Sequence, residues 1–520
     1  MPQLRVVRTL NMRRSTSPPH KELHLLLTDI AHEAYRSLLL AANPVLARFV
    51  RVIFTKPPVA PSPSRLHIAL LLIKRGLQYY VNNGLQLLAF FRQPKRQGRP
   101  GAALHRLHLA GRVLVLDSDC FLQRTLDSGT LDIFEIPGLA EEAHEQGYPL
   151  VVAATLVGEV SEELGPQLTA ILARQPYPVL TPLGACTWTD MARLCWLTFW
   201  YPLALGWFLL RLDTKERPEM RAFQHECLET LPTIVAHAFL RHVFGRRLAK
   251  LFPQGMTVIS WCENRAGDKL FYRGLRSQGV PLEIIGAQLF VYPDNYIAAY
   301  ITRAETEHGM APDRLVCNGP GYLPQDGLLP ASVGPALRYA GLFAFDPARA
   351  RNGTDILITL GYSGVREALQ ILSQVRWPAS IRILIRMHPA HSLVQWEDSL
   401  PARCVAAQGP LHERFSHCQA VVGAETGALL EALSCGVPVI HLNIPGDQSL
   451  GFLPALGKDT VWFGATTSQD VERLLEMTRT VAPETLLEYA ERYRQEFFNR
   501  PEPGHLLEQF GVSPADFARS

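Results

Sequence analysis

From residue 111 onward, short apolar runs alternate with amphipathic stretches and with clusters of Gly, Pro and polar residues. Runs rich in Val, Ile and Leu that are bounded by turn residues are typical of strands covered on both faces. The amphipathic stretches 138–147, 294–308 and 468–481 predict helices. This alternation of predicted strands and helices predicts an α/β fold with parallel sheets. The predicted strands lie in 111–119, 148–157, 256–264, 282–290, 314–322, 354–360, 381–387, 418–423 and 461–464.

A chain of 520 residues is too long for a single core, so we expect more than one domain. The two groups of predicted strands are separated by a stretch that is rich in Pro, Gly and Ala and has little periodicity. We therefore predict a basic helical region at 1–110, a first Rossmann-like domain at 111–325, a linker at 326–353 and a second Rossmann-like domain with terminal helices at 354–520.

Three apolar segments do not fit the α/β rhythm: 34–54, 65–99 and 194–210. Charges interrupt the first two before about 20 apolar residues accumulate, so neither is predicted to span a bilayer. The third carries no charge but contains Pro202 and four aromatic residues. That composition favours an interfacial patch or a buried helical hairpin over a membrane crossing.

The charge is distributed unevenly. Residues 1–112 contain eighteen Lys and Arg against three Asp and Glu, a local charge of +15, while the whole chain has +3. Basic amphipathic helices suit an anionic membrane surface, although a helical cap with solvated charges explains them as well. No nucleic-acid recognition module accompanies the charge. We expect a cytoplasmic protein, peripheral at the inner membrane, because no signal peptide begins the chain and the nine cysteines show no paired spacing.

Two polar loops follow predicted strands of the second domain. The sequence HPAH (388–391) comes after the strand 381–387, and AETG (424–427) comes after the strand 418–423. Ligands of open parallel sheets bind outside the carboxyl ends of the strands. We interpret the two loops as belonging to neighbouring strands and forming the floor of one site.

The loop AETG opens a predicted helix. The first N–H groups of a helix have no internal partner and attract anions. Thr426 adds a hydroxyl donor, and Gly427 lets a ligand approach closely. Glu431, one turn further on, could accept hydrogen bonds from a sugar or ribose hydroxyl. Ordinary helix capping with Glu431 in solvent is the alternative.

His388 is the candidate for contact with a donor phosphate or leaving group. Pro389 biases it towards an extended conformation, which directs the imidazole along the strand. The glycine-bearing loop 361–364 follows the strand 354–360 at the same predicted edge.

A strand that ends in HP, followed by a hydroxyl turn and a helix reading EAL-x-x-G-x-PVI, resembles the C-terminal half of GT-B glycosyltransferases. The resemblance is strongest to bacterial CMP-sugar transferases (sialyl, polysialyl and Kdo types) and to CDP-glycerol glycerophosphotransferases. It implies that His388, Thr426 and Glu431 contact the donor. Those families commonly have two adjacent hydroxyl residues at the turn, where this chain has Glu425-Thr426.

Inverting transfer needs a general base on the acceptor side. Glu263, after the predicted strand 256–264, is our candidate, and Asp117 and Asp119 are the alternatives. Each could instead cap a helix. Asp117-Ser118-Asp119 spells the DxD of metal-dependent enzymes, but the C-terminal half predicts a metal-independent fold with no metal site.

The leading hypothesis is a metal-independent glycosyltransferase that moves a sugar from a nucleotide-activated donor, with CMP-sugar favoured, to a surface polysaccharide or glycolipid. A sugar-nucleotide 2-epimerase and a non-catalytic polysaccharide biosynthesis or export protein are the alternatives. No cofactor is expected, because the donor is a co-substrate. The expected partners are the donor, a glycan or glycolipid acceptor and an anionic membrane, with no nucleic acid. The predicted catalytic residues are Glu263 and His388, and the predicted donor-binding residues are Gly361, Tyr362, Ser363, Arg386, His388, Pro389, Glu425, Thr426, Gly427 and Glu431.

Overall fold

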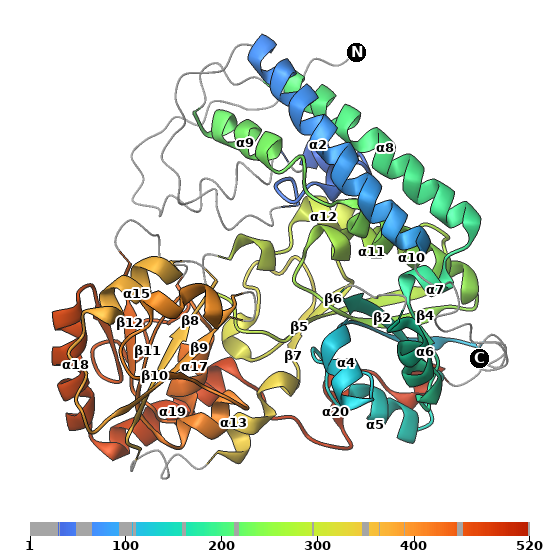
Figure 1. Ribbon diagram of the computed structural model, residues 1–520. Coiled ribbons are helices and arrows are strands. Elements are labelled where there is room, and N and C mark those ends of the chain that lie inside the picture. Colours follow the sequence, from blue (N-terminus) through green and yellow to red (C-terminus); the bar gives the residue numbers. More distant parts are fainter. Residues whose placement is uncertain are drawn as a thin grey trace.

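The computed structural model describes residues 30, 32–47, 65–92, 107, 111–158, 163–212, 218–293, 296–345, 353–362, 364–388, 391–444 and 451–517. It consists of two α/β domains, with long helices lying over the first (Figure 1). The predicted fold class is confirmed. Both domains are Rossmann-like, because every strand pair is parallel and each sheet follows the 3-2-1-4-5-6 order of doubly wound folds.

The first sheet has the order β3-β2-β1-β4-β5-β6-β7. Both of its faces are buried: Leu114 and Leu116 lie in one core and Val113 and Val115 in another. Its strands are β1 Val113–Phe121, β2 Leu150–Val157, β3 Val179–Leu180, β4 Met256–Trp261, β5 Leu282–Gln288, β6 Arg314–Cys317 and β7 Ala331–Val333. Its helices are α4 Leu122–Ser128, α5 Leu139–Glu145, α6 Gly165–Arg174, α7 Pro182–Ala185, α10 Ala236–Leu251, α11 Ala266–Arg276, η2 Ile297–Ala299, α12 Arg303–Glu307 and η3 Pro320–Tyr322.

The second sheet has the order β10-β9-β8-β11-β12-β13 and is likewise covered on both faces. Its strands are β8 Asp355–Leu360, β9 Arg382–Met387, β10 Cys404–Ala406, β11 Cys418–Ala424, β12 Val439–Leu442 and β13 Trp462–Ala465. Its helices are α13 Ala340–Ala344, α15 Val365–Ser373, η5 Leu393–Ser399, α16 Leu411–Phe415, α17 Ala428–Ser434, α18 Ser468–Thr480 and α19 Pro483–Phe497.

Three placements differ from the sequence interpretation. The segment expected to be a linker contributes the edge strand β7 and the turn η4 (Leu337–Tyr339). The last described elements, α20 (Leu506–Gln509) and η6 (Pro514–Phe517), pack on the first domain, because Leu507 and Phe510 are buried in its core. In the stretch 294–308, the described structure is η2 and α12 rather than one helix.

The helices over the first domain are α2 (Arg65–Arg92), α8 (Trp188–Arg211) and α9 (Pro218–Glu229), with the short turn η1 (Leu40–Ala42) beneath them. Helices α2 and α8 lie side by side in opposite directions (Figure 1), with Phe91 stacked on Trp188 at one end and Leu72 against Gly206 at the other. No helix in the described ranges is both long and apolar enough to cross a membrane.

Of the two alternatives for 194–210, an interfacial patch or a buried helical hairpin, the hairpin is wrong, because α8 continues through Pro202. A proline inside a helix leaves the carbonyl four residues earlier without its usual donor. Here that carbonyl, on Thr198, accepts a hydrogen bond of 2.7 Å from the hydroxyl of Tyr79 on α2. The tertiary contact replaces the lost hydrogen bond, so the helix is not broken.

Candidate active site

In each sheet the direction of winding reverses between the first and the fourth strand, at β1 and β4 in one domain and at β8 and β11 in the other. Ligands of doubly wound sheets bind at this switch point. The carboxyl ends of the two sheets meet: a Cβ atom at Gly427, after β11, would lie 3.0 Å from the Cβ atom of Val291, after β5. The candidate active site is therefore the interface between the carboxyl ends of the two sheets.

On the second domain, the ends of β8 and β11 approach so closely that only glycine fits at position 361. A Cβ atom at Gly361 would lie 1.9 Å from the carbonyl oxygen of Glu425. The Gly361 N–H donates to the carbonyl of Ala424 at 2.9 Å. Close packing thus explains why glycine stands at position 361, without any contribution from a ligand.

His388 lies beside this junction. Its backbone N–H donates to the carbonyl of Leu360 at 3.0 Å, and its ring meets the edge of Tyr362 with the ring centroids 5.7 Å apart. Tyr362 is 51% exposed. The predicted residues Ser363 and Pro389 lie outside the described residues.

The expectation that the strands ending at His388 and at Thr426 are neighbours is wrong, because β8 lies between β9 and β11. The intervening strand ends in Gly361 and Tyr362. The two predicted loops therefore lie at the same carboxyl end of the sheet, and the loop that follows β8 lies between them.

Glu425 does not face the start of α17 as a free carboxylate. It is buried, has a φ of 48°, and holds one carboxylate oxygen 3.5 Å from Nε2 of His441 on β12. The Nδ1 atom of His441 lies 3.0 Å from Oδ1 of Asn443. The carboxylate is thus directed along the sheet towards His441.

The helix start at Thr426 is already partly satisfied. The Ala428 N–H donates to the Thr426 hydroxyl at 3.3 Å, and Gly427 is covered by Val291. Helix α17 has only seven residues. A phosphate site at this turn stays a prediction.

Arg386 is engaged with backbone atoms. Its Nη1 donates to the carbonyls of Ala407 and Gly409, each at 3.2 Å. These bonds tie the end of β9 to the segment after β10.

Arg338, on η4, lies between carboxylates of the two domains, and the sequence interpretation missed it. Its guanidinium lies 4.3 Å from the ring centroid of Phe134 and 5.4 Å from that of Trp261. Burial raises the pKa of Glu431, on α17, to about 7, and the charge of Arg338 opposes that rise. The same charge helps to lower the pKa of Glu263. No motif in the Pro- and Gly-rich stretch around residue 338 marks this arginine.

Glu263 is held as an ion. Its Oε1 accepts from the indole N–H of Trp261 at 3.1 Å, and its Oε2 accepts from Nε of Arg265 at 2.9 Å. Burial would raise the pKa of Glu263, but the Arg265 charge and these hydrogen bonds outweigh it and lower the pKa. A carboxylate that is stabilised in its charged form is a weaker base than an ordinary glutamate.

Asp117 is part of a buried network that joins three strands to α10. Arg241 donates to both of its carboxylate oxygens at 2.6 Å, and the hydroxyl of Ser260 on β4 donates to Oδ2 at 2.6 Å. Arg241 also donates to Thr155 on β2. These contacts account for Asp117 without a ligand.

Asp119 is the less constrained carboxylate at the end of β1. Its nearest cation is Arg265, with Nη1 at 3.5 Å from Oδ2. Burial raises its pKa, Arg265 and Arg241 oppose the rise, and Asp117 and Glu263 add to it. Glu135, which the sequence interpretation also missed, accepts from the Asp119 N–H at 2.8 Å and from the Ser118 hydroxyl at 3.0 Å. In the parts of the chain that the structure describes, no group of three or more His, Cys, Asp or Glu could hold a metal ion.

Comparison with known proteins gives only distant likeness. No family model matches the chain, and no curated protein matches it. Among solved structures, MurG from Acinetobacter baumannii aligns with 14% identity and a TM-score of 0.39, over 77% of this chain and 99% of that one. The UDP co-structure of MnaA from S. aureus aligns with 12% identity and a TM-score of 0.39, over 78% and 98%. The calicheamicin glycosyltransferase CalG4 gives 12% identity and a TM-score of 0.39, over 78% and 96%. At these values the likeness carries no argument about activity.

Proposed function

We propose that this protein is a glycosyltransferase that moves a sugar from a nucleotide-activated donor to a glycan or glycolipid acceptor. The observation that carries the proposal is that the carboxyl ends of two Rossmann-type sheets, which bear polar and ionisable side chains, meet at one interface. A donor bound at one sheet and an acceptor bound at the other would then react between them. CMP-sugar is the donor we favour, on the motifs around His388 and Thr426.

In this proposal the second domain binds the donor. His388 and the exposed Tyr362 stand at the end of the sheet where a donor phosphate would lie, and the Thr426 hydroxyl is at the same edge. Glu431, whose pKa of about 7 keeps part of the population protonated near neutral pH, could donate or accept a hydrogen bond with a donor hydroxyl.

The first domain would supply the general base. Asp119 suits this role better than Glu263, because its pKa is raised while that of Glu263 is lowered. Glu263 then acts as a positioning residue that holds the Arg265 side chain beside Asp119.

A nucleotide panel combined with His388→Ala tests the donor side. We expect CMP, CDP, UDP or GDP to raise the thermal midpoint of the wild-type protein, because a ligand that binds only the folded state stabilises it. With the sugar derivative of the nucleotide that binds, His388→Ala is expected to lower turnover by about 10²-fold or more, through loss of charge stabilisation or proton donation.

His417→Ala is the matched control, because His417 is exposed and precedes β11 at the opposite edge of the same sheet. It should leave turnover unchanged. Near-normal turnover in His388→Ala would remove this histidine from the chemistry, and a panel in which no nucleotide shifts the midpoint would contradict the donor site.

We further propose that α2 and α8 place the protein on an anionic membrane. The ring contacts Tyr80–Phe199 and Phe91–Trp188 join exposed apolar side chains of both helices into one surface, here called the apolar face. Exposed apolar side chains that gather on one surface mark a site of contact with a membrane or another molecule. The apolar face comprises Leu70, Ile73, Leu77, Tyr80, Val81, Leu85, Leu88 and Phe91 of α2 and Trp188, Trp196, Phe199, Trp200, Leu203, Trp207 and Leu210 of α8.

The charges around the apolar face support an anionic surface as its partner. Helix α2 contains no acidic residue, and the single acid of α8, Asp190, is buried in a capping box with Thr187. Exposed cations lie at the ends of both helices; Arg211, for example, stands 3.9 Å from the Trp207 ring centroid. Trp rings beside basic residues suit the boundary between headgroups and acyl chains.

The double substitution Trp196→Ser/Trp207→Ser tests this contact, since these side chains are 57% and 61% exposed. We expect vesicle binding to weaken by at least about tenfold in co-sedimentation, because each tryptophan would lose its burial in the bilayer. Val394→Ser, which removes a 78% exposed side chain from the second domain, is the control. Equal vesicle binding by the double variant and the wild type would contradict membrane contact through α8.

A further inference from the structure

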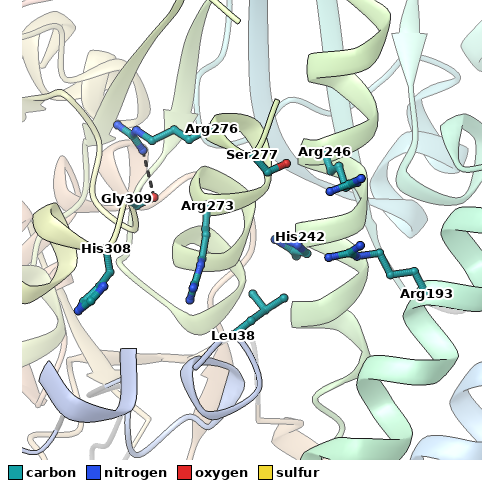
Figure 2. A pocket seen from close by; sticks show the side chains of 9 residues that line it. All are labelled: Leu38, Arg193, His242, Arg246, Arg273, Arg276, Ser277, His308 and Gly309. Carbon is teal, nitrogen blue, oxygen red and sulfur yellow. Dashed lines mark hydrogen bonds between the residues drawn. The ribbon is translucent and has the colours of Figure 1, made fainter. Parts of the chain in front are cut away.

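A basic cavity lies on the first domain, away from the interface between the two sheets. It has a volume of about 380 Å³ and lies between α8, α10, α11 and the residues that follow α12 (Figure 2). That volume falls within the range of about 300–1,000 Å³ common for small-ligand sites. The described residues that line it include four arginines and two histidines and no acidic residue: Leu38, Arg193, His242, Arg246, Arg273, Arg276, Ser277, His308 and Gly309.

The arginine charges of the cavity are poorly compensated. Arg276 pairs with Asp313 at 2.7 Å, and Arg273 donates to the backbone carbonyl of Tyr35 at 3.0 Å. Among the described residues, neither Arg193 nor Arg246 has a hydrogen-bond or ion-pair partner. Partial burial and the nearby Arg246 charge lower the pKa of Arg193, while Asp190 opposes this from within its capping box.

Two histidines add polar atoms for which the described residues supply no hydrogen-bond partner. His242 is buried, and its Nδ1 lies 3.2 Å from the Leu270 carbonyl, which leaves Nε2 for another group. The Arg193 and Arg246 side chains extend towards this ring (Figure 2). The buried Nε2 atom of His308 has no hydrogen-bond partner in the part of the chain that the structure describes. Buried polar atoms without partners are uncommon and call for a ligand or an ion.

Helix stabilisation explains only part of this arrangement. Arg273 and Arg276 are in the last turn of α11, where cations favour the negative end of the helix dipole. Arg193 lies in the first half of α8, and Arg246 is not in the last turn of α10. Helix stabilisation therefore does not explain why Arg193 and Arg246 line the same cavity.

We propose that this cavity binds a phosphate group. Guanidinium groups bind phosphate oxygens through paired, charge-assisted hydrogen bonds. A bound phosphate would neutralise Arg193 and Arg246 and reach the two histidines. The site does not depend on the proposed transfer reaction, because it shares no residue with the interface between the sheets.

Two kinds of ligand could supply the phosphate group: a free phosphate ion and the headgroup of an anionic lipid. The apolar face bears on the choice, because Arg193 is exposed on α8 three and seven positions before Trp196 and Trp200. Residues at these spacings share one side of a helix. A lipid whose phosphate entered the cavity could therefore place its chains along α8.

The double variant Arg193→Gln/Arg246→Gln tests the site in the full-length protein. Inorganic phosphate is titrated calorimetrically, and co-sedimentation compares phosphatidylcholine vesicles with vesicles that also contain phosphatidylglycerol. We expect the variant to bind phosphate, or the phosphatidylglycerol vesicles, at least about tenfold more weakly than the wild type. The control, Arg366→Gln/Arg473→Gln, removes two exposed arginines of the second domain and should bind like the wild type.

If the double variant loses phosphate binding but keeps the wild-type preference for phosphatidylglycerol vesicles, the ligand is a free anion. Loss of the phosphatidylglycerol preference, with phosphatidylcholine binding unchanged, identifies a lipid headgroup. Absence of wild-type binding in both arms, or an equal loss in the control, would overturn the proposal. The variant should keep its thermal midpoint and its shift with nucleotide, because neither arginine has a partner among the described residues that would support the fold. A failure of the anion test can thus be distinguished from a failure of the proposed donor site.

Discussion

Asp119→Asn is expected to lower the rate of sugar transfer by about 10²- to 10⁴-fold while nucleotide binding is retained, because the substitution removes the proposed general base. The test measures kcat and KM with the donor that the nucleotide panel identifies. The loss should fall on kcat, since Asp119 belongs to the first domain and the proposed donor site to the second.

The pH profile gives a second readout. Because burial raises the pKa of Asp119, the wild-type rate should fall on acidification at a pH above the ordinary aspartate value of about 4. This fall in rate at acidic pH should disappear in Asp119→Asn. Glu263→Gln should still show it and should lose less activity than Asp119→Asn, because Glu263 acts through Arg265.

Asp127→Asn is the matched control, because Asp127 is an exposed carboxylate on α4 that pairs with Gln123. Wild-type turnover in Asp119→Asn would contradict the assignment of the base. A loss in Glu263→Gln that exceeds the loss in Asp119→Asn would return the role to Glu263.

Lys269→Met is expected to destabilise the first domain by about 3–5 kcal/mol, because it leaves a buried carboxylate without its cation. The Nζ atom of Lys269 lies 2.7 Å from Oε1 of Glu305, and both side chains have 0% exposure. Lys269 also donates to the Tyr35 hydroxyl and the Ala47 carbonyl. The pair thus attaches the segment 32–47 to α11 and α12.

The measurement is the denaturant midpoint and slope of the transition that reports the first domain. Lys269→Met/Glu305→Gln should recover a large part of the loss, because glutamine carries no charge and can still serve at the third position of the helix. The exposed Lys250→Met on α10 should change the free energy of unfolding by less than about 0.5 kcal/mol. A similar small change in Lys269→Met would show that the buried charge of Glu305 does not need its partner.

The arrangement of the candidate site was only partly predictable from the sequence. Gly361, Tyr362, His388 and Thr426 were placed correctly at strand ends, because the apolar runs before them have clear boundaries. The partners of Glu263 and Glu425 could not be predicted, since Arg265 and His441 are two and sixteen positions away and only folded geometry brings their charged atoms together. Arg338 and Glu135 were missed because no local pattern distinguishes them from surface residues.

The sequence by itself determined the α/β class, most strands and the edge of each sheet that carries polar residues. Burial on both faces imposes a continuous apolar run, and a turn must follow it, so these features are local. The tertiary structure alone decided that β8 separates β9 from β11, that α8 continues through Pro202, and that four arginines from three helices surround one cavity. Such contacts join segments far apart in the chain. They form only when complete sheets and helices are buried against one another, so periodicity along a single segment carries no information about them.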